Sequence, residues 1–407
     1  MRILHLNTLF PPWQVGGAER TVKALASGMA ALNHEVAVLH TVPYADGASA
    51  KRQEQLHTYS APLRNFYWQF DGLKRHSAQR FAWHFLDSNN PWMQARVREV
   101  LTEFQPDYVL THTVQGFSNR VWKTAAGGPH RLIHVLHDQA LLCPQTAMFR
   151  NGQACQQQCR TCHYLTERKR PYAEHVQAVI SVSHALLQKH REHGFFVNLP
   201  GDAVHNGYSD AWPEAVPALP YLTACTSDEA QVAPVLTLGY LGRVEPGKGI
   251  EFLLQVMQEL RTYPLRLLIA GRGDEEYVGH LQEKYGHLNI SFMGQVNKVD
   301  FFPQLDVLTV PSLLFEGLGN TAIEATVWGR PAIVSDQGGL KELTTETLGK
   351  VCRVQGSEAI AQWKSAILHY LDKNVLRHSY QEALAIRNKY QVESVAKAYL
   401  RLLPELV

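Results

Sequence analysis

Short β-rich runs alternate with longer helical patterns along the whole sequence, and this alternation most constrains what the chain can fold into. The runs predicted as strands are 2–7, 35–41, 107–112, 131–137 and 178–183 in the first half, then 235–242, 265–271, 290–294, 307–312, 331–335 and 350–354. Helical patterns such as IEFLLQVMQELRTY lie between them. Such alternation is typical of parallel sheets with helices on both faces. The sequence therefore predicts an α/β protein with two doubly wound domains.

The length of 407 residues also favours two domains, because one hydrophobic core rarely grows that large. A stretch rich in Pro, Ala, Ser and Thr without a sustained period covers residues 207–234 and is predicted to be the linker. The predicted domains are therefore 1–206 and 235–373. The last helices, 374–407, are predicted to pack back across the linker.

The composition excludes several classes of function. Lys and Arg number 39 against 37 Asp and Glu, and this formal charge of +2 provides no general attraction to nucleic acid. No apolar run reaches the length of a membrane-spanning helix, and the start of the chain does not resemble a signal peptide. We therefore expect a cytoplasmic protein without a nucleic-acid partner.

Two glycines, Gly16 and Gly17, follow the first predicted strand and open a helix that is predicted to begin near Ala18. Glycine at this position lets backbone N–H groups approach an anion at the positive end of a helix. The alternative is a plain tight turn between strand and helix.

A second basic loop follows the strand at 235–242. The segment GRVEPGKG places Arg243 and Lys248 five residues apart just before a helix. An arginine and a lysine on one loop can converge on a diphosphate. The alternative is a pair of solvated loop bases.

Two acids flank a glycine-bearing turn in EGLGNTAIE, where Glu316 precedes a predicted helix and Glu324 lies about one turn inside it. A helical rise would separate them by about 12 Å, close to the span from sugar to ribose in a nucleotide-diphosphate sugar. The N–H groups of Leu318, Gly319 and Asn320 are predicted to face a phosphate at the helix end. The alternative is that Glu316 is a cap and Glu324 an ordinary acid on a helix face.

Taken together, these motifs resemble glycosyltransferase family 4. EGLGNTAIE resembles its E-x7-E signature and GRVEPGKG its R-x4-K element, while GGAER, NGYS and FMGQV stand in the expected order. The resemblance covers nearly the whole chain. It implies the GT-B fold, in which two Rossmann-like domains face a central cleft, with an acceptor-side first domain, a nucleotide-sugar-binding second domain and retention of anomeric configuration.

The resemblance also implies roles for the motif residues. Glu316 would contact hydroxyls of the donor sugar and Glu324 those of the ribose, while Arg243 and Lys248 would hold the diphosphate. The backbone at Gly294 would line the base pocket. Gly17 would lie near the diphosphate in a closed state of the enzyme.

Departure of a nucleoside diphosphate needs stabilisation of negative charge. Family members generally use basic side chains and helix ends for this, and the sequence contains no convincing DxD-type metal site. We therefore expect catalysis without a metal cofactor, through Glu316, Arg243, Lys248 and His137. The expected donor is a nucleotide-diphosphate sugar carrying UDP or GDP, and the expected acceptor is a saccharide or a lipid-linked saccharide.

Three residues at strand ends of the first half are candidates for the sugar and acceptor side. His137 ends the predicted strand 131–137, where the family has a histidine near the sugar and acceptor. Asp138 follows it and is predicted to orient His137 or to contact the acceptor. His112, at the end of the preceding strand, is the weaker candidate. Most of the 20 histidines are expected to be ordinary surface or core residues.

Four cysteines, Cys143, Cys155, Cys159 and Cys162, crowd into one loop region. Four thiolates suit a structural Zn²⁺ or, less well, an iron–sulfur cluster, and a loop of this length has little core of its own. Reduced structural thiols are the alternative.

Aromatic and basic residues interleave in the segment 64–85, RNFYWQFDGLKRHSAQRFAWHF. This pattern suits peripheral contact with an anionic membrane that holds a lipid-linked acceptor. A helical arm that packs on the first domain explains it equally well.

The sequence therefore predicts a retaining glycosyltransferase, with a role in surface polysaccharide assembly. Two alternatives share the architecture: a nucleotide-sugar 2-epimerase and a noncatalytic nucleotide-sugar-binding subunit. The presence of both acids and both bases in the motifs argues against the noncatalytic protein.

Overall fold

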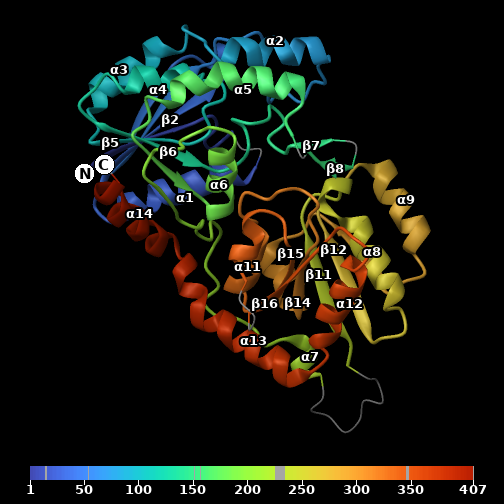
Figure 1. Ribbon diagram of the computed structural model, residues 1–407. Helices are drawn as coiled ribbons and strands as arrows, with labels where there is room; N and C mark the ends of the chain where they lie inside the picture. Colours follow the sequence, from blue (N-terminus) through green and yellow to red (C-terminus); the bar gives the residue numbers. More distant parts are fainter. Residues whose placement is uncertain are drawn as a thin grey trace. The chain divides into compact units, whose positions relative to one another are not determined.

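The chain forms two compact units (Figure 1). The computed structural model describes residues 1–13, 16–53, 55–150, 152–155, 157–224, 234–344 and 348–406. Unit 1 comprises Met1–Met148, Cys155–Ser209 and Gln391–Val407, and unit 2 comprises Phe149–Ala154 and Asp210–Tyr390. The sequence predicts the domain change at residue 207, and the two units divide between Ser209 and Asp210.

Unit 1 is built on an eight-stranded sheet with the order β10-β9-β6-β5-β1-β2-β4-β3. All neighbours pair in parallel except β3 and β4, which are antiparallel. Its strands are β1 Arg2–Asn7, β2 Glu35–Val42, β3 Ala50–Gln53, β4 Leu56–Pro62, β5 Tyr108–Thr111, β6 Arg131–Leu136, β9 Ala178–Ser181 and β10 Gly201–Ala203. The central strands are buried along almost their whole length, as expected for a sheet covered on both faces.

Helices cover the sheet of unit 1 (Figure 1). They are α1 Gly17–Ala31, η1 Tyr44–Asp46, α2 Ser77–Asp87, α3 Gln94–Phe104, α4 Arg120–Ala125, α5 Arg160–Ala173, α6 His184–Glu192 and α14 Val392–Leu406. The C-terminal helix α14 packs on α1, and its apolar side chains join the core formed by β1, β2 and α1. Gly28 of α1 permits this approach, because a Cβ there would lie 2.8 Å from Cγ1 of Val392.

Unit 2 is built on a six-stranded parallel sheet with the order β13-β12-β11-β14-β15-β16. Its strands are β11 Leu236–Leu241, β12 Leu265–Ala270, β13 Ile290–Gly294, β14 Val307–Val310, β15 Ala332–Ser335 and β16 Gly349–Cys352. A separate antiparallel hairpin joins β7 Phe149–Arg150 to β8 Gln153–Ala154.

The helices of unit 2 are α7 Pro220–Thr223, η2 Pro246–Lys248, α8 Ile250–Glu259, α9 Glu275–Tyr285, α10 Lys298–Phe301, η3 Phe302–Gln304, α11 Asn320–Val327, η4 Gly339–Glu342, α12 Ala359–His369, α13 Lys373–Ile386 and η5 Arg387–Tyr390. Apolar side chains of α8, α12 and α13 form one core with the sheet. Every strand turns into its following helix at the carboxyl edge of the sheet, where ligands bind in open α/β folds.

All eleven predicted strands are present, and the predicted α/β class is confirmed. The sequence analysis missed β3, β4, β10 and the short hairpin. Part of the predicted linker is also structured: Leu219 is fully buried in the core of unit 2, and the backbone N–H of Tyr221 donates to Asp306 at 2.7 Å. Residues 225–233 of the predicted linker lie outside the described residues.

Within the described ranges, every helix is too short or too polar to cross a membrane.

Candidate functional site

Two loops meet at the carboxyl edge of the unit 2 sheet. The loop after β11 carries Gly247, whose carbonyl accepts backbone hydrogen bonds from Leu313 at 2.9 Å and Leu314 at 3.2 Å in the loop after β14. Gly249 has a φ of 72°, and a Cβ there would lie 1.8 Å from the carbonyl oxygen of Pro311. Only glycine allows so close an approach of the two backbones.

This contact brings together two of the predicted site residues. Nζ of Lys248 lies 2.7 Å from Oε1 of Glu316, and the hydroxyl of Ser312 donates to the same oxygen at 2.6 Å. Both charged side chains are partly exposed, at 23% and 18%. A cation and an acid therefore stand side by side where a ligand can reach them.

The backbone of Glu316 is held by the loop after β15. Its carbonyl accepts the N–H of Gly339 at 2.9 Å. Gly338 has a φ of 62°, and a Cβ there would lie 2.1 Å from the same carbonyl oxygen. Glu316 is thus held by the loops that follow β11 and β15, the two strands on either side of β14.

Arg243 does not join this pair. Its guanidinium lies 3.0 Å from Glu245 and its side chain is 70% exposed. Its backbone is anchored, because the Tyr240 hydroxyl donates to the Arg243 carbonyl at 2.6 Å. Burial, and next the charge of Glu316, raise the pKa of Tyr240, so the hydroxyl keeps its proton.

Glu324 lies in α11 and is buried. Nζ of Lys298, at the start of α10, lies 2.6 Å from its Oε1 and also 2.6 Å from Oδ2 of Asp210. The sequence analysis missed Lys298, although it follows the quoted FMGQV segment by two residues. Lys298, Glu324 and Asp210 therefore form a second cluster of charged side chains in unit 2.

The turn before α11 has the predicted form. The helix begins at Asn320, and Gly319 caps it with a φ of 97°. A Cβ on Gly319 would meet Cδ2 of Leu340 at 2.2 Å, and Leu318 is buried. Gly294, at the end of β13, has a φ of 63°, and its carbonyl accepts the N–H of Gly271 at 2.7 Å.

In unit 1, α1 begins at Gly17, as predicted within one residue. The N–H of Gly16 donates to Oε2 of Glu19 at 2.9 Å. The carboxylate of Glu19 thus occupies a donor at the helix end that the sequence analysis assigned to an anion.

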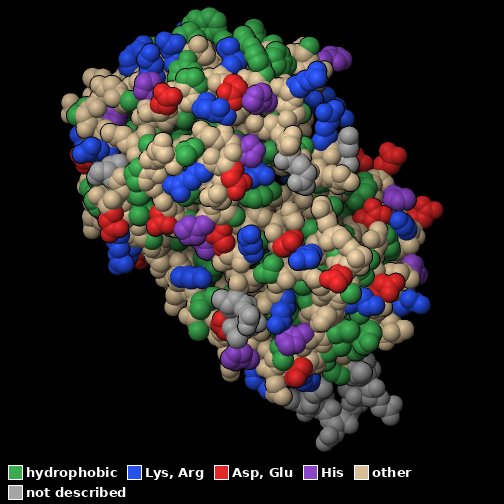
Figure 2. Space-filling view, in the orientation of Figure 1, with side chains coloured by type: hydrophobic (Ala, Val, Ile, Leu, Met, Phe, Trp, Pro, Cys, Tyr) green, Lys and Arg blue, Asp and Glu red, His purple; other side chains and the backbone are tan. Residues whose placement is uncertain are grey.

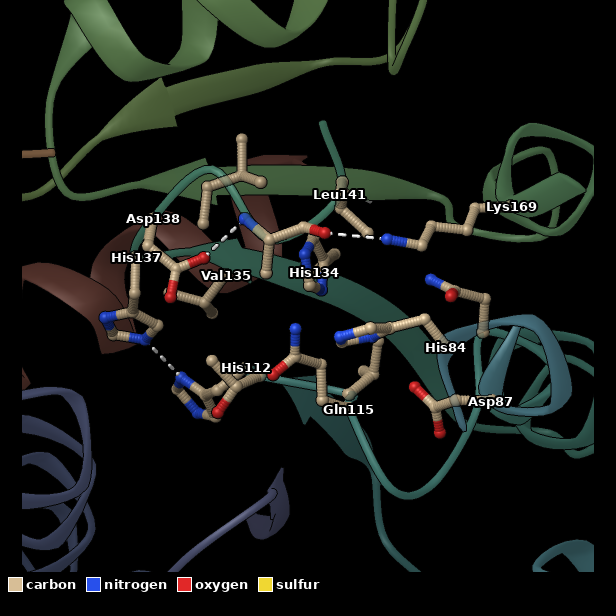
Figure 3. A pocket seen from close by; sticks show the side chains of 15 residues that line it. His84, Asp87, His112, Gln115, His134, Val135, His137, Asp138, Leu141 and Lys169 are labelled. Atoms are coloured by element: carbon tan, nitrogen blue, oxygen red, sulfur yellow. Dashed lines mark hydrogen bonds between the residues drawn. The ribbon is translucent and has the colours of Figure 1, made fainter. Parts of the chain in front are cut away.

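The predicted residues His112, His137 and Asp138 line one pocket of unit 1 (Figure 3). His112 follows β5 and His137 follows β6, and their Nδ1 and Nε2 atoms lie 2.8 Å apart. Asp138 accepts the N–H of Ala140 at 2.7 Å, and burial raises its pKa to about 6. The structure therefore joins the two predicted histidines directly.

Lys169 and Asp87 also line this pocket, and the sequence analysis missed both. Nζ of Lys169, on α5, donates to the carbonyl of Ala140 at 2.7 Å, and burial lowers its pKa. Asp87, at the end of α2, accepts the N–H of Gly116 at 2.8 Å, and burial raises its pKa to about 7. Neither residue stands in a recognisable motif, so only their burial in the folded chain reveals them.

The four cysteines are only partly gathered. The sulfurs of Cys143 and Cys162 lie 3.8 Å apart, and Cys159 caps α5 by accepting the N–H of Cys162 at 3.5 Å. Two ligands of a tetrahedral thiolate zinc site are separated by about 3.8 Å. Among the described residues, however, no three His, Cys, Asp or Glu side chains converge as a metal site requires. The zinc site that includes Cys155 stays a prediction, which metal analysis of the purified protein tests.

Comparison with known families decides what the two units are. Residues 15–211 match the family model described as Glycosyltransferase Family 4, and residues 235–373 match the one described as Glycosyl transferases group 1. The chain belongs to glycosyltransferase family 4. It is therefore a glycosyltransferase, and the matched ranges contain every predicted site residue of both units.

Curated relatives of this glycosyltransferase are distant. An uncharacterized 42.6 kDa protein in the cps region of Klebsiella pneumoniae is 24% identical over 344 residues, which are 84% of this chain and 87% of that protein. A phosphatidyl-myo-inositol mannosyltransferase of Mycobacterium leprae is 32% identical over 177 residues, which are 41% of this chain and 46% of that protein.

Solved structures establish the GT-B fold of the glycosyltransferase. Sucrose-phosphate synthase from Thermosynechococcus elongatus aligns with a TM-score of 0.74 and 18% identity, covering 100% of this chain and 98% of that one. HepE of Anabaena, in complex with UDP and glucose, aligns with a TM-score of 0.66 and 18% identity over the full length of both chains. At sequence identities this low, the structural similarity supports a shared fold and nothing more.

Proposed function

We propose that the protein is a retaining glycosyltransferase that moves a sugar from a nucleotide-diphosphate donor to a saccharide or lipid-linked saccharide. The donor would bind at the carboxyl edge of the unit 2 sheet. Catalysis would use basic side chains in place of a metal cofactor. The observation that carries this proposal is the 2.7 Å contact between Lys248 and Glu316.

This contact places one suitable side chain for each side of the bond that breaks, which joins the donor sugar to the diphosphate. Glu316 can accept hydrogen bonds from hydroxyls of the donor sugar, while Lys248 beside it can neutralise the departing diphosphate. Arg243 is exposed on the same loop, and its guanidinium can turn from Glu245 to a phosphate as a bidentate donor. The N-terminus of α11 adds backbone donors.

Glu324 suits the ribose. Its carboxylate can accept hydrogen bonds from two hydroxyls, and the ammonium group of Lys298 lies beside the buried carboxylate at 2.6 Å. Lys298 also pairs with Asp210, so it can remain neutralised when Glu324 turns to the nucleotide.

Retention requires that the acceptor attack from the face that the leaving group vacates. In the single-step form of this attack, which we propose here, the acceptor proton passes to the leaving phosphate oxygen and the protein supplies no nucleophile. The pocket with His137 and Asp138 would then bind sugar and acceptor hydroxyls. Burial lowers the pKa of His137 to about 4, so it acts there as a neutral hydrogen-bonding group.

The relatives suggest the class of acceptor. The names of two of them refer to a cps region and to phosphatidyl-myo-inositol, and a further structural neighbour is a lipopolysaccharide outer core galactosyltransferase, WaaB (TM-score 0.65). We propose by analogy a role in polysaccharide or glycolipid synthesis, with peripheral contact to the cytoplasmic membrane.

A thermal-shift panel of UDP, GDP, ADP, dTDP and CDP tests the donor. A nucleotide at about 100 times its dissociation constant should stabilise the protein by about 2.7 kcal/mol. One nucleotide that raises the melting temperature by several degrees identifies the donor class, and its sugars can then be tested with lipid-linked and free acceptors.

Product analysis by NMR tests the reaction itself. The anomeric configuration of the donor should persist in the product, and EDTA should leave the rate unchanged. Donor turnover without any acceptor would instead identify an epimerase, and an inverted product would contradict the retaining mechanism.

A further inference from the structure

Three histidines on neighbouring strands of unit 1 form a hydrogen-bonded chain. His5 lies within β1, His112 follows β5 and His137 follows β6, and the sheet order β6-β5-β1 makes the three strands adjacent. Nδ1 of His5 lies 2.9 Å from Nε2 of His112, and Nδ1 of His112 lies 2.8 Å from Nε2 of His137. The chain thus connects the interior of the sheet to the proposed sugar pocket.

The rings meet edge to edge. The centroids of His5 and His112 are 5.2 Å apart with an interplanar angle of 12°. Those of His112 and His137 are 5.1 Å apart at 35°. In each pair the distance between the ring centroids exceeds the distance between the bonded nitrogens by about the width of one ring. This difference is expected when the two nitrogens lie on the line between the centroids and point at each other, as a hydrogen bond requires.

Each histidine of the chain is neutral near neutral pH. Burial lowers the pKa of His5 to about 3 and that of His137 to about 4, and burial together with the neighbouring histidines lowers the pKa of His112 well below its usual value. A neutral imidazole has one N–H and one acceptor nitrogen. The protons of the chain can therefore be arranged in only two ways, and in each the tautomer of one ring dictates that of the next.

His5 selects between the two arrangements. Its Nε2 is fully buried and lacks a hydrogen-bond partner among the described residues. A buried N–H without a partner is rarer in proteins than an unpaired acceptor. The proton of His5 therefore belongs on Nδ1, from which it donates to His112, and His112 in turn donates from its own Nδ1 to Nε2 of His137.

We propose that His5 and His112 are positioning residues that hold His137 in its Nδ1–H tautomer, so that the ring nitrogen of His137 that does not bond to His112 carries an N–H that can donate to a ligand. Figure 3 shows the second ring nitrogen of His137 pointing away from His112. An N–H there can donate to a sugar oxygen or to charge that develops on it. The tautomer rests on the structure of unit 1 alone, while its use in sugar transfer rests on the proposed function.

The first test uses the unmodified protein without substrate. Labelling histidine with ¹⁵N and recording long-range ¹H–¹⁵N correlation spectra identifies the protonated nitrogen of each ring. His137 should carry its proton on Nδ1. A proton on Nε2 of His137 overturns the inference, whatever reaction the enzyme performs.

Variants then test the cause. His112→Leu removes both hydrogen bonds and should shift His137 toward the Nε2–H form that solvated histidines prefer. His112→Gln should keep the Nδ1–H form, because its carbonyl can accept from His5 while its amide donates to His137. An unchanged tautomer in His112→Leu contradicts the proposal, and the Gln variant guards against loss of fold.

His190→Gln is the matched control. His190, on α6, is also buried, and its Nδ1 bonds to the carbonyl of Leu186 at 2.9 Å while its Nε2 has no partner in the described part of the chain. It lies outside the chain of three histidines, so its replacement should leave the His137 signals unchanged.

The kinetic readout separates this inference from the proposed function. His112→Leu should lower kcat about tenfold, as expected for one transition-state hydrogen bond, without changing nucleotide affinity. The Gln variant should recover most of that loss. An altered tautomer with unchanged kcat would leave the positioning intact and remove His137 from the proposed mechanism.

Discussion

The two units hold their ionisable site residues in opposite ways. In unit 2, Lys248 and Lys298 lie at the surface edge of the sheet and each pairs with an acid at 2.6 to 2.7 Å. In unit 1, burial makes His112 and His137 neutral and raises the pKa of Asp138. The comparison indicates that unit 2 is suited to bind charge, whereas unit 1 is suited to exchange hydrogen bonds with uncharged sugar hydroxyls.

The largest effect is expected from Lys248→Ala. Loss of the cation beside the departing diphosphate should lower kcat by about 10²- to 10³-fold, as for other groups that stabilise transition-state charge. Lys284→Ala is the control, since Lys284 forms an exposed pair with Glu251 at 2.8 Å on the same unit. Steady-state kinetics with the identified donor measure both. Equal rates in the two variants would mean that unit 2 does not act through charge.

The pH dependence of stability tests the opposite character of unit 1. Burial raises the pKa of Asp87 from 3.8 to about 7, so the folded state binds this proton more tightly than the unfolded state. Its contribution to the free energy of unfolding is therefore largest at low pH and is lost as the pH rises toward 7. Between about pH 5 and pH 8, the wild type should lose about 2–3 kcal/mol relative to Asp87→Asn.

Denaturant unfolding at the two pH values measures this change. Asp46→Asn, at an exposed position in η1, is the control and should track the wild type. If Asp87→Asn also tracks the wild type, Asp87 is charged in the folded protein and unit 1 is not the neutral environment described above.

The third effect is on nucleotide binding in unit 2. Glu324→Ala removes the acid proposed to accept hydroxyls of the ribose and should raise the nucleotide dissociation constant by about 10- to 100-fold, the worth of hydrogen bonds to a charged group. Calorimetric titration measures the change, with Glu283→Ala on the exposed face of α9 as control. Unchanged affinity would show that the pair of Lys298 and Glu324 is structural only.

The same contrast explains what the sequence could predict. Unit 2 keeps its functional residues in short motifs, where Glu316 and the start of α11 follow from local spacing and turn chemistry. Lys298 was missed because its partner Glu324 is 26 residues away. His5 was missed because it reads as an ordinary strand residue, and only the order of the strands brings it to His112, 107 residues along the chain. The strands β3, at the edge of the sheet, and β4, next to it, were missed because their polar side chains lack a clear alternation.

The smallest effect is expected on the outer surface of unit 1, where the segment 64–85 carries aromatic and basic side chains. The predicted helical arm is present as α2, and Trp83 anchors it by burial and by donating to the carbonyl of Tyr67 at 3.0 Å. Phe81 and Phe85 nevertheless stay 38% and 39% exposed and stack with Tyr164 of α5. In Figure 2, hydrophobic side chains gather beside Lys and Arg where Figure 1 places α2. One face of α2 can therefore pack on unit 1 while another face stays available for contact with a membrane.

Arg80→Ala tests the membrane contact. Arg80 is exposed on α2, and a basic residue near an anionic bilayer contributes about 1 kcal/mol, so vesicle binding should weaken roughly fivefold. Co-sedimentation with phosphatidylserine-containing vesicles at low salt measures it. Arg401→Ala, on α14 at the other side of unit 1 in Figure 1, should bind as the wild type does. If the wild-type protein does not bind such vesicles, we would instead assign the exposed aromatic side chains to contact with the acceptor saccharide. Stacking on sugar rings needs flat apolar faces but does not need the neighbouring basic residues.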